Sequence, residues 1–130
     1  METVMTIRVA ESDIDELGHM SYLKYIQYVQ DARRDWYEQA GFPLAKKREE
    51  EQITVVMKKF EIVYLKETVA GETLKIVTSP LRLGIKSFTL KHVIYNQKEE
   101  PVTEAESTMV GFNLSNRTGI KVPDEIARYF

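Results

Sequence analysis

The chain has 130 residues, of which 43% are hydrophobic and 29% charged, a composition typical of a folded globular protein and a length that predicts one domain over residues 1–130. Its net charge of −2 argues against a general nucleic-acid binder, which would carry a basic excess. The chain has no cysteine, which excludes disulfides, thiol nucleophiles and thiolate metal sites.

The first third of the chain predicts one strand and one long helix. Apolar and polar residues alternate over residues 3–10, which is typical of a strand. Apolar residues then recur at steps of three and four over residues 22–40, which predicts an amphipathic helix. Ser21 is the expected N-cap, with its hydroxyl accepting an amide proton, and Gly41 and Pro43 are expected to end the helix. At 1.5 Å per residue the helix is roughly 28 Å long, which favours a helix lying across a sheet.

Everything after residue 53 favours strands, because Val, Ile, Thr, Phe and Tyr are abundant between short turn sequences. The predicted strands cover residues 54–65, 73–83, 86–96 and 102–114. The connections are too short for crossover helices, so neighbouring strands are expected to pair antiparallel. Pro80 predicts a bulge or a sheet edge.

Two further segments receive weaker predictions. The charged residues 46–51 are expected to form a solvated loop or a helix end, and residues 123–130 a closing helical turn. The fold class is therefore α+β, with a curved antiparallel sheet around one long helix. A second copy of the chain is expected to cover the other face of this sheet or its open edge.

Two features bear on cellular location. No apolar run approaches the ~20 residues that span a bilayer, and the N-terminus lacks the basic start and apolar core of a signal peptide. The sequence thus predicts a cytoplasmic protein without a membrane partner.

The acidic loop before the long helix is the most informative segment. Asp13, Asp15 and Glu16 lie just ahead of the predicted helix N-terminus. One interpretation is electrostatic, because carboxylates are favoured at the positive end of a helix dipole. The other is catalytic: backbone amides at a helix start can hold an oxyanion, and a carboxylate can attack a carbonyl or activate a water. Pattern alone leaves both open.

The loop and the helix together resemble the opening of hotdog-fold acyl-CoA thioesterases, most closely the 4-hydroxybenzoyl-CoA thioesterase type. The resemblance rests on the segment Asp13-Ile14-Asp15-Glu16-Leu17-Gly18-His19-Met20, followed by Tyr25, Tyr28, Ala32 and Arg33. Weaker matches follow in the family's order at Glu61–Tyr64, Ala70–Leu74, Lys86–Phe88 and Val122–Pro123. The resemblance implies a hotdog fold, in which a curved sheet wraps around one central helix.

The resemblance also implies a role for each matching residue. Asp15 matches the catalytic carboxylate, a nucleophile or general base, and the backbone amide of Tyr22 matches the group that polarises the thioester carbonyl. The remaining matches are His19 near the thioester, Gly18 and Tyr25 in substrate binding, and Lys86 and Ser87 near the CoA phosphates or pantetheine. Many relatives carry two Asn where this chain has Ser21 and Tyr22, which bears on the acyl group accepted.

The implied function is hydrolysis of an acyl-CoA or acyl-ACP thioester to a free acid and a thiol. The implied assembly is a homodimer or homotetramer whose sites lie between subunits, with no metal or redox cofactor. The alternatives are a non-catalytic module that binds an acyl thioester or other small ligand, and hydratase chemistry using His19 with Asp15.

Overall fold

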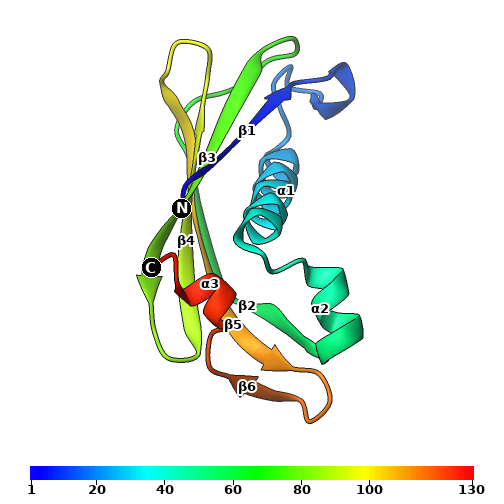
Figure 1. Ribbon diagram of the computed structural model, residues 1–130. Coiled ribbons are helices and arrows are strands. Elements are labelled where there is room, and N and C mark those ends of the chain that lie inside the picture. Colours follow the sequence, from blue (N-terminus) through cyan, green and yellow to red (C-terminus); the bar gives the residue numbers. More distant parts are fainter.

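The computed structural model describes all residues, 1–130. The chain forms six strands and three α-helices, which are labelled in Figure 1. In chain order they are β1 (Thr3–Arg8), α1 (Tyr22–Ala40), α2 (Leu44–Glu51), β2 (Ile53–Tyr64), β3 (Thr73–Leu83), β4 (Ser87–Tyr95), β5 (Pro101–Asn113), β6 (Thr118–Ile120) and α3 (Asp124–Ala127), with a 3₁₀ turn at Glu11–Asp13.

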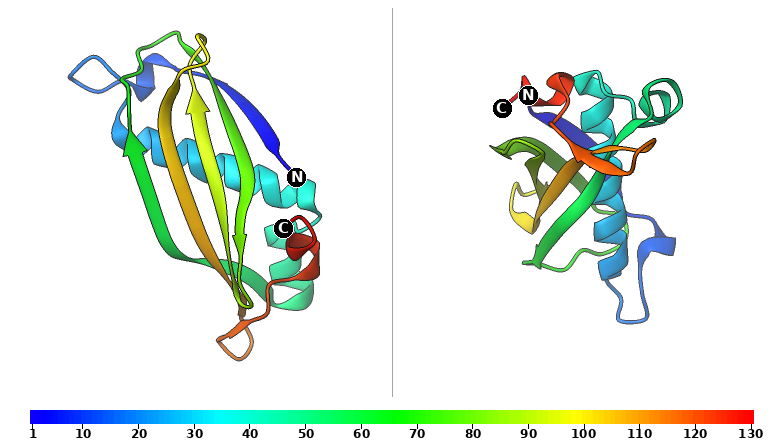
Figure 2. Two further views of the ribbon diagram at one scale, coloured as in Figure 1. Left: turned by 90° about the vertical axis from the view of Figure 1, so that its left-hand side faces the viewer. Right: turned by 90° about the horizontal axis from the view of Figure 1, so that it is seen from below.

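The strands form one sheet in the order β1-β3-β4-β5-β2, and β6 pairs with β5. Every pairing is antiparallel, as the short connections predict. The sheet curls, and α1 runs across one of its faces (Figures 1 and 2). Strand β2, at 12 residues, is an outer edge of this sheet.

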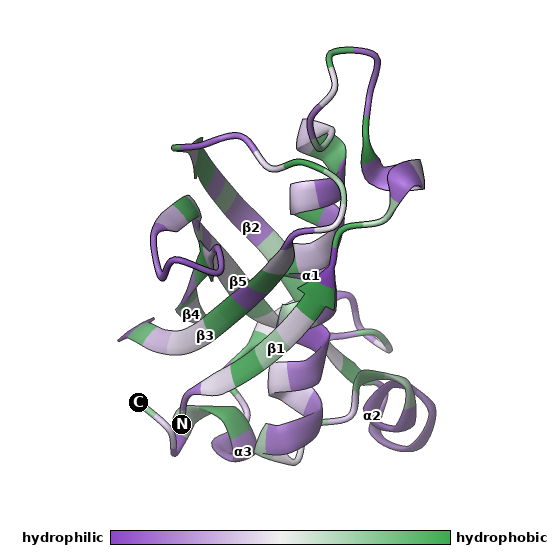
Figure 3. Cartoon of the chain, turned by 90° about the horizontal axis from the view of Figure 1, so that it is seen from above, coloured by the Kyte–Doolittle hydropathy of each residue, from purple (hydrophilic) through white to green (hydrophobic).

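The long helix forms over the predicted residues, 22–40, because one side of it is apolar. Figure 3 shows hydrophobic and hydrophilic residues alternating around α1 and along the strands. The buried side chains of α1 belong to two core clusters, the first around Val29 and Ala32 and the second around Trp36 and Ala40. Both clusters include residues of β3, β4 or β5, so α1 is held to the sheet along most of its length.

The sequence predicts how α1 ends more accurately than how it begins. Gly41 ends the helix with φ of +87°, a left-handed conformation that glycine adopts without strain. Ser21 is the N-cap residue, but the prediction that its hydroxyl caps the helix is wrong. The Lys24 amide instead donates to the Ser21 backbone oxygen at 3.0 Å.

The expectation of one helix needs correction, because α2 and α3 accompany α1. The charged stretch from residue 46 lies in α2, where Lys47 pairs with Glu51 at 2.6 Å and with Glu125 of α3 at 2.8 Å. These ion pairs join the two short helices. The predicted helical turn within residues 123–130 is confirmed as α3, whereas pattern alone left residues 46–51 open between a loop and a helix end. No helix of the chain has the length and apolar character needed to cross a membrane.

The strand predictions hold to within a residue or two, with one omission. Strand β6 is not among the predicted strands, and its three residues pair with the end of β5. The expected irregularity at Pro80 is confirmed as a shift of register between Pro80 and Arg82. Pairing of β3 with β1 ends at Thr78, so the β1 side of Pro80 needs no amide hydrogen.

Candidate active site

The loop before α1 folds back on itself through backbone hydrogen bonds. Ile14 and Met20 form a bridge, and the Asp15 amide donates to the His19 oxygen at 3.1 Å. The Gly18 amide donates to the backbone oxygen of Asp15 at 3.1 Å, and Gly18 has φ of +87°. A side chain at this φ is strained, so glycine allows the tight turn that presents Asp15.

The two aspartates of the loop have different environments. Asp13 is buried and accepts hydrogen bonds from the Tyr28 hydroxyl at 2.5 Å and the Ala10 amide at 3.0 Å, with Lys24 Nζ 3.5 Å away. Burial alone would raise the pKa of Asp13, but these hydrogen bonds and the Lys24 charge outweigh it and lower the pKa. Asp13 therefore ties the loop to α1 as a structural anion.

Asp15, in contrast, is partly exposed and faces a cavity. One of its oxygens, Oδ1, accepts a hydrogen bond from the Leu17 amide at 2.9 Å, which fixes the side chain in a turn of its own. No cation of the chain pairs with this carboxylate within 4.0 Å. Its second oxygen accepts no hydrogen bond and can act on a substrate.

The first turn of α1 lies beside Asp15 and offers backbone donors. The amides of Tyr22 and Leu23 have no acceptor within the chain, as is usual at a helix start. Tyr64, at the end of β2, donates from its hydroxyl to the Tyr22 oxygen at 3.1 Å. The Tyr64 ring meets the Tyr25 ring edge-on, with centroids 5.3 Å apart. The end of β2 thus fixes the position of the helix start.

These groups surround a cavity of about 370 Å³ that is mostly aromatic and apolar. It is lined by Asp15, Leu17, His19, Met20, Tyr22, Tyr25, Tyr64, Leu65, Lys66 and Glu67. Asp15, His19 and Tyr22, whose backbone amide is unpaired at the helix start, thus line one concave, largely apolar cavity. That combination can hold a carbonyl oxygen while a base or nucleophile acts on its carbon.

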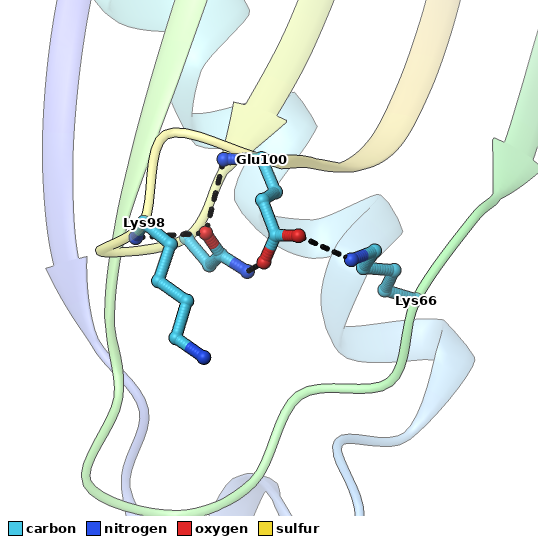
Figure 4. A network of polar contacts seen from close by, with 4 residues as sticks. Lys66, Lys98 and Glu100 are labelled. Carbon is cyan, nitrogen blue, oxygen red and sulfur yellow. Dashed lines mark hydrogen bonds and ion pairs between the residues drawn. The ribbon is translucent and has the colours of Figure 1, made fainter.

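The outer wall of the cavity is anchored to the β4–β5 hairpin. The amides of Leu65 and Lys66 both donate to the Val102 oxygen, at 2.9 and 3.2 Å. Lys66 pairs with Glu100 (Figure 4), with 2.5 Å between Nζ and Oε2. The other carboxylate oxygen of Glu100 accepts a hydrogen bond from Asn96 Nδ2 at 3.0 Å. Hydrogen bonds from Lys66 and Asn96 lower the pKa of Glu100, so Glu100 holds this wall as an anion.

The structure brings together four of the predicted site residues and separates the others. Asp15, His19, Tyr22 and Tyr25 all line the cavity, and Gly18 shapes the loop without lining it. Sequence reasoning gave no site role to Tyr64–Glu67, although Tyr64 belongs to one of the matched segments; only the fold brings this segment to the helix start.

Lys86 and Ser87 lie at the opposite end of the sheet. Ser87 pairs with Val110 near the end of β5, whereas the cavity wall is bonded to Val102 near its start. Eight residues of strand separate these positions, roughly 26 Å. Ser87 lines a different cavity of about 290 Å³ together with Arg82 and Thr108. Within one chain, Lys86 and Ser87 therefore lie at the other end of the sheet from the cavity of Asp15.

The fold and this site define a class, that of hotdog thioesterases, and comparison with known proteins agrees. Residues 9–130 match the profile of the Thioesterase-like superfamily, and the chain belongs to this family. The resemblance expected from the sequence is confirmed.

Individual relatives are distant in sequence and close in fold. The chain is 24% identical over 115 residues to 1,4-dihydroxy-2-naphthoyl-CoA hydrolase of Thermosynechococcus vestitus, covering 88% of this chain and 79% of the relative. A Staphylococcus aureus protein solved in complex with CoA superposes with a TM-score of 0.92 at 20% identity, over 99% of this chain and 81% of that one. The 4-hydroxybenzoyl-CoA thioesterase of Pseudomonas sp. strain CBS-3 gives 0.89 at 20% identity, over 99% of both chains.

Proposed function

We propose that this protein hydrolyses an acyl-CoA or acyl-ACP thioester to a free carboxylic acid and a thiol. The observation that carries the proposal is that Asp15 and Tyr22, whose backbone amide has no acceptor within the chain, line the same cavity. Family membership and the relatives named as CoA-thioester hydrolases support the same reaction.

In this reaction the thioester carbonyl oxygen accepts a hydrogen bond from the Tyr22 amide, at the positive end of α1. Asp15 either attacks the carbonyl carbon directly, forming an anhydride that water then opens, or takes a proton from the water that attacks. In both routes the carbon–sulfur bond breaks and its electron pair leaves with the thiolate. His19 lies in the same cavity, where it can contact the thioester.

The cavity also bears on the substrate. Tyr22, Tyr25 and Tyr64 give it flat aromatic walls, and Gly18 keeps the loop backbone open to approach. The relatives in Thermosynechococcus vestitus and Pseudomonas are named for aromatic acyl groups. Aromatic thioesters are therefore the first substrates to test, ahead of aliphatic ones.

The proposal also covers how the CoA or ACP part of the substrate is bound and how many copies of the chain form the working unit. Lys86 and Ser87 contact the phosphates or pantetheine of a substrate held at Asp15 of another copy, because they lie too far from Asp15 of their own chain. The working unit is then a homodimer or a homotetramer of one-domain chains, residues 1–130.

The test is a thiol-release assay with purified protein and a panel of aromatic, short and long acyl-CoA thioesters. We expect steady release of CoA thiol over many turnovers from at least one of them. Binding of acyl-CoA in calorimetry without any release across the panel contradicts the proposal and favours a non-catalytic binding module.

A further inference from the structure

A second cavity lies farther along α1, towards the C-terminal end of the helix. It has a volume of about 220 Å³ and is lined by Gln30, Arg33, Arg34, Tyr37, Leu44, Val55, Met57 and Met109. Its walls come from α1 on one side and from β2 and β5 on the other. Nothing in the proposed reaction, as it occurs within one chain, uses this cavity.

Arg33 lines this cavity, and no acidic side chain of the chain pairs with its guanidinium. Its Nη1 donates to Ser107 Oγ at 3.0 Å, which is its one hydrogen bond to another side chain. No carboxylate of the chain lies within 4.0 Å of the guanidinium. Arg33 is half-buried, and burial lowers its pKa more than the interaction with Tyr37 raises it. A guanidinium has five N–H donors, so most of those of Arg33 remain available to a ligand.

Tyr37 supplies a second unsatisfied donor in the same cavity. Its side chain is 2% exposed, and its hydroxyl has no hydrogen-bond partner. A buried hydroxyl without a partner is unfavourable, and most such groups in proteins have one. Tyr37 and Arg33 are one helical turn apart on α1 and interact electrostatically. The Tyr37 hydroxyl and most of the N–H groups of Arg33 therefore lack an acceptor, and both side chains line the same cavity.

The chemistry of the cavity indicates which acceptor fits. One partly buried guanidinium balances one negative charge, and its planar fork matches a carboxylate. The phenol of Tyr37 can donate to the same group. Leu44, Val55 and Met57 provide apolar surface for the hydrocarbon that carries the carboxylate.

The edge strand β2 relates this cavity to the reaction cavity of a second copy. The outer side of β2 is unpaired, and its Val56, Met57, Val63 and Tyr64 are between 37% and 54% exposed. A long apolar edge of this kind is a template for pairing with another chain. Two copies joined antiparallel along β2, about a two-fold axis near its middle, keep both helices on one face of a continuous sheet.

This pairing places opposite ends of β2 side by side. The reaction cavity lies at the Tyr64 end of the strand, and the cavity of Arg33 lies at the Val55 and Met57 end. We propose that Arg33 and Tyr37 of one copy bind a carboxylate at the far end of the acyl group held at Asp15 of the other copy. The inference rests on the proposed function and gives it a substrate class, thioesters of dicarboxylic acids.

The test compares matched pairs of thioesters. Each pair is an acyl-CoA that ends in a carboxylate and a plain acyl-CoA of the same length, from four to ten carbons, and the measured quantity is the ratio of their kcat/KM values. For the wild type we expect a ratio of at least tenfold in favour of the carboxylate at one or more lengths. Arg33→Met should bring that ratio to about one, and Tyr37→Phe should lower it several-fold.

Thr103→Val is the matched control, because Thr103 is another buried residue whose hydroxyl has no partner, and it lines neither cavity. It should keep the wild-type ratio. The inference is overturned if the wild type has the same kcat/KM for both thioesters of every pair. It is also overturned if Arg33→Met and Tyr37→Phe keep the wild-type ratio, including the case in which they lower both kcat/KM values equally.

A separate measurement distinguishes failure of this inference from failure of the proposed function. If no thioester is cleaved, the proposed hydrolysis is wrong, and calorimetry with free glutarate, adipate and suberate then tests the cavity alone. Binding of any of these acids by the wild type that weakens several-fold in Tyr37→Phe supports the carboxylate site. Absence of binding, or equal binding by the wild type and Tyr37→Phe, overturns it. Tyr37→Phe removes only an unpaired hydroxyl, so this variant is expected to fold.

Discussion

Asp13 and Asp15 stand two residues apart in one loop and have opposite roles. Asp13 is buried among donors that hold it charged, and Asp15 keeps one oxygen free beside a cavity. Pattern alone leaves a structural and a catalytic role open for the acidic residues of this loop. The hydrogen bonds of the folded loop decide which is which.

The role of Asp13 leads to a prediction about Tyr28. Removing the Tyr28 hydroxyl takes one donor from a buried anion, which typically costs about 1.5–3 kcal/mol of unfolding free energy. We expect Tyr28→Phe to be less stable than wild type by about that amount at pH 7, measured by urea denaturation. Tyr95→Phe, whose hydroxyl makes no hydrogen bond to another side chain, is the control.

The same variant has a pH dependence with a definite sign. The pKa of Asp13 is lower in the folded protein than its ordinary value of 3.8, so its contribution is present above that pH and is lost as the pH falls through the folded value. The difference in unfolding free energy between wild type and Tyr28→Phe should therefore be smaller at pH 3 than at pH 7. A difference that is equal at pH 7 and pH 3 contradicts the role given to Asp13.

At the scale of elements, a polar row divides the core between the two apolar clusters. His92 of β4 is completely buried and meets Thr78 Oγ1 of β3 at 3.0 Å and Ser107 Oγ of β5 at 2.9 Å. Arg33 of α1 reaches the same Ser107. This row joins three strands and the helix, and a slip of any strand by one residue would leave the histidine unpaired.

His92 predicts how the sheet responds to acid. Burial, and secondarily the Arg33 charge, lower its pKa from 6.5 to about 3. Between these values the unfolded chain binds a proton that the folded one does not, so stability falls as the pH drops below 6.5. Wild type should lose about 2 kcal/mol more than His92→Gln between pH 7 and pH 4.5 in urea denaturation. An equal loss of unfolding free energy in wild type and His92→Gln over this pH range would contradict the lowered pKa of His92.

Periodicity predicts the large elements well and the small ones poorly. Helix α1 and strand β3 begin and end at the predicted residues, because each has a long apolar pattern and clear terminators. Helix α2 has no buried residue and depends on ion pairs to α3 and within itself, so its sequence has no apolar stripe to detect. Strand β6 is three residues long and is held by pairing alone.

At the scale of the whole molecule, the sequence predicts four of the ten residues that line the candidate site, Asp15, His19, Tyr22 and Tyr25. The loop and the helix start are contiguous in the chain, so their motif is visible in it. Tyr64 and Lys66 reach the cavity only because β2 returns along the helix, a contact between residues some 40 positions apart. Lys86 and Ser87 lie at the far end of the sheet, which leaves their proposed role to a second copy.

The central claim is that the Asp15 carboxylate performs the thioester hydrolysis, and the most direct measurement is kcat for Asp15→Asn on the best acyl-CoA of the panel. Glu16→Gln is the matched control, since it neutralises the neighbouring acid, which does not line the cavity. We predict that Asp15→Asn lowers kcat by ~10² or more, as expected for loss of a base or nucleophile, while Glu16→Gln stays near wild type. Equal kcat values for wild type and Asp15→Asn would contradict the account.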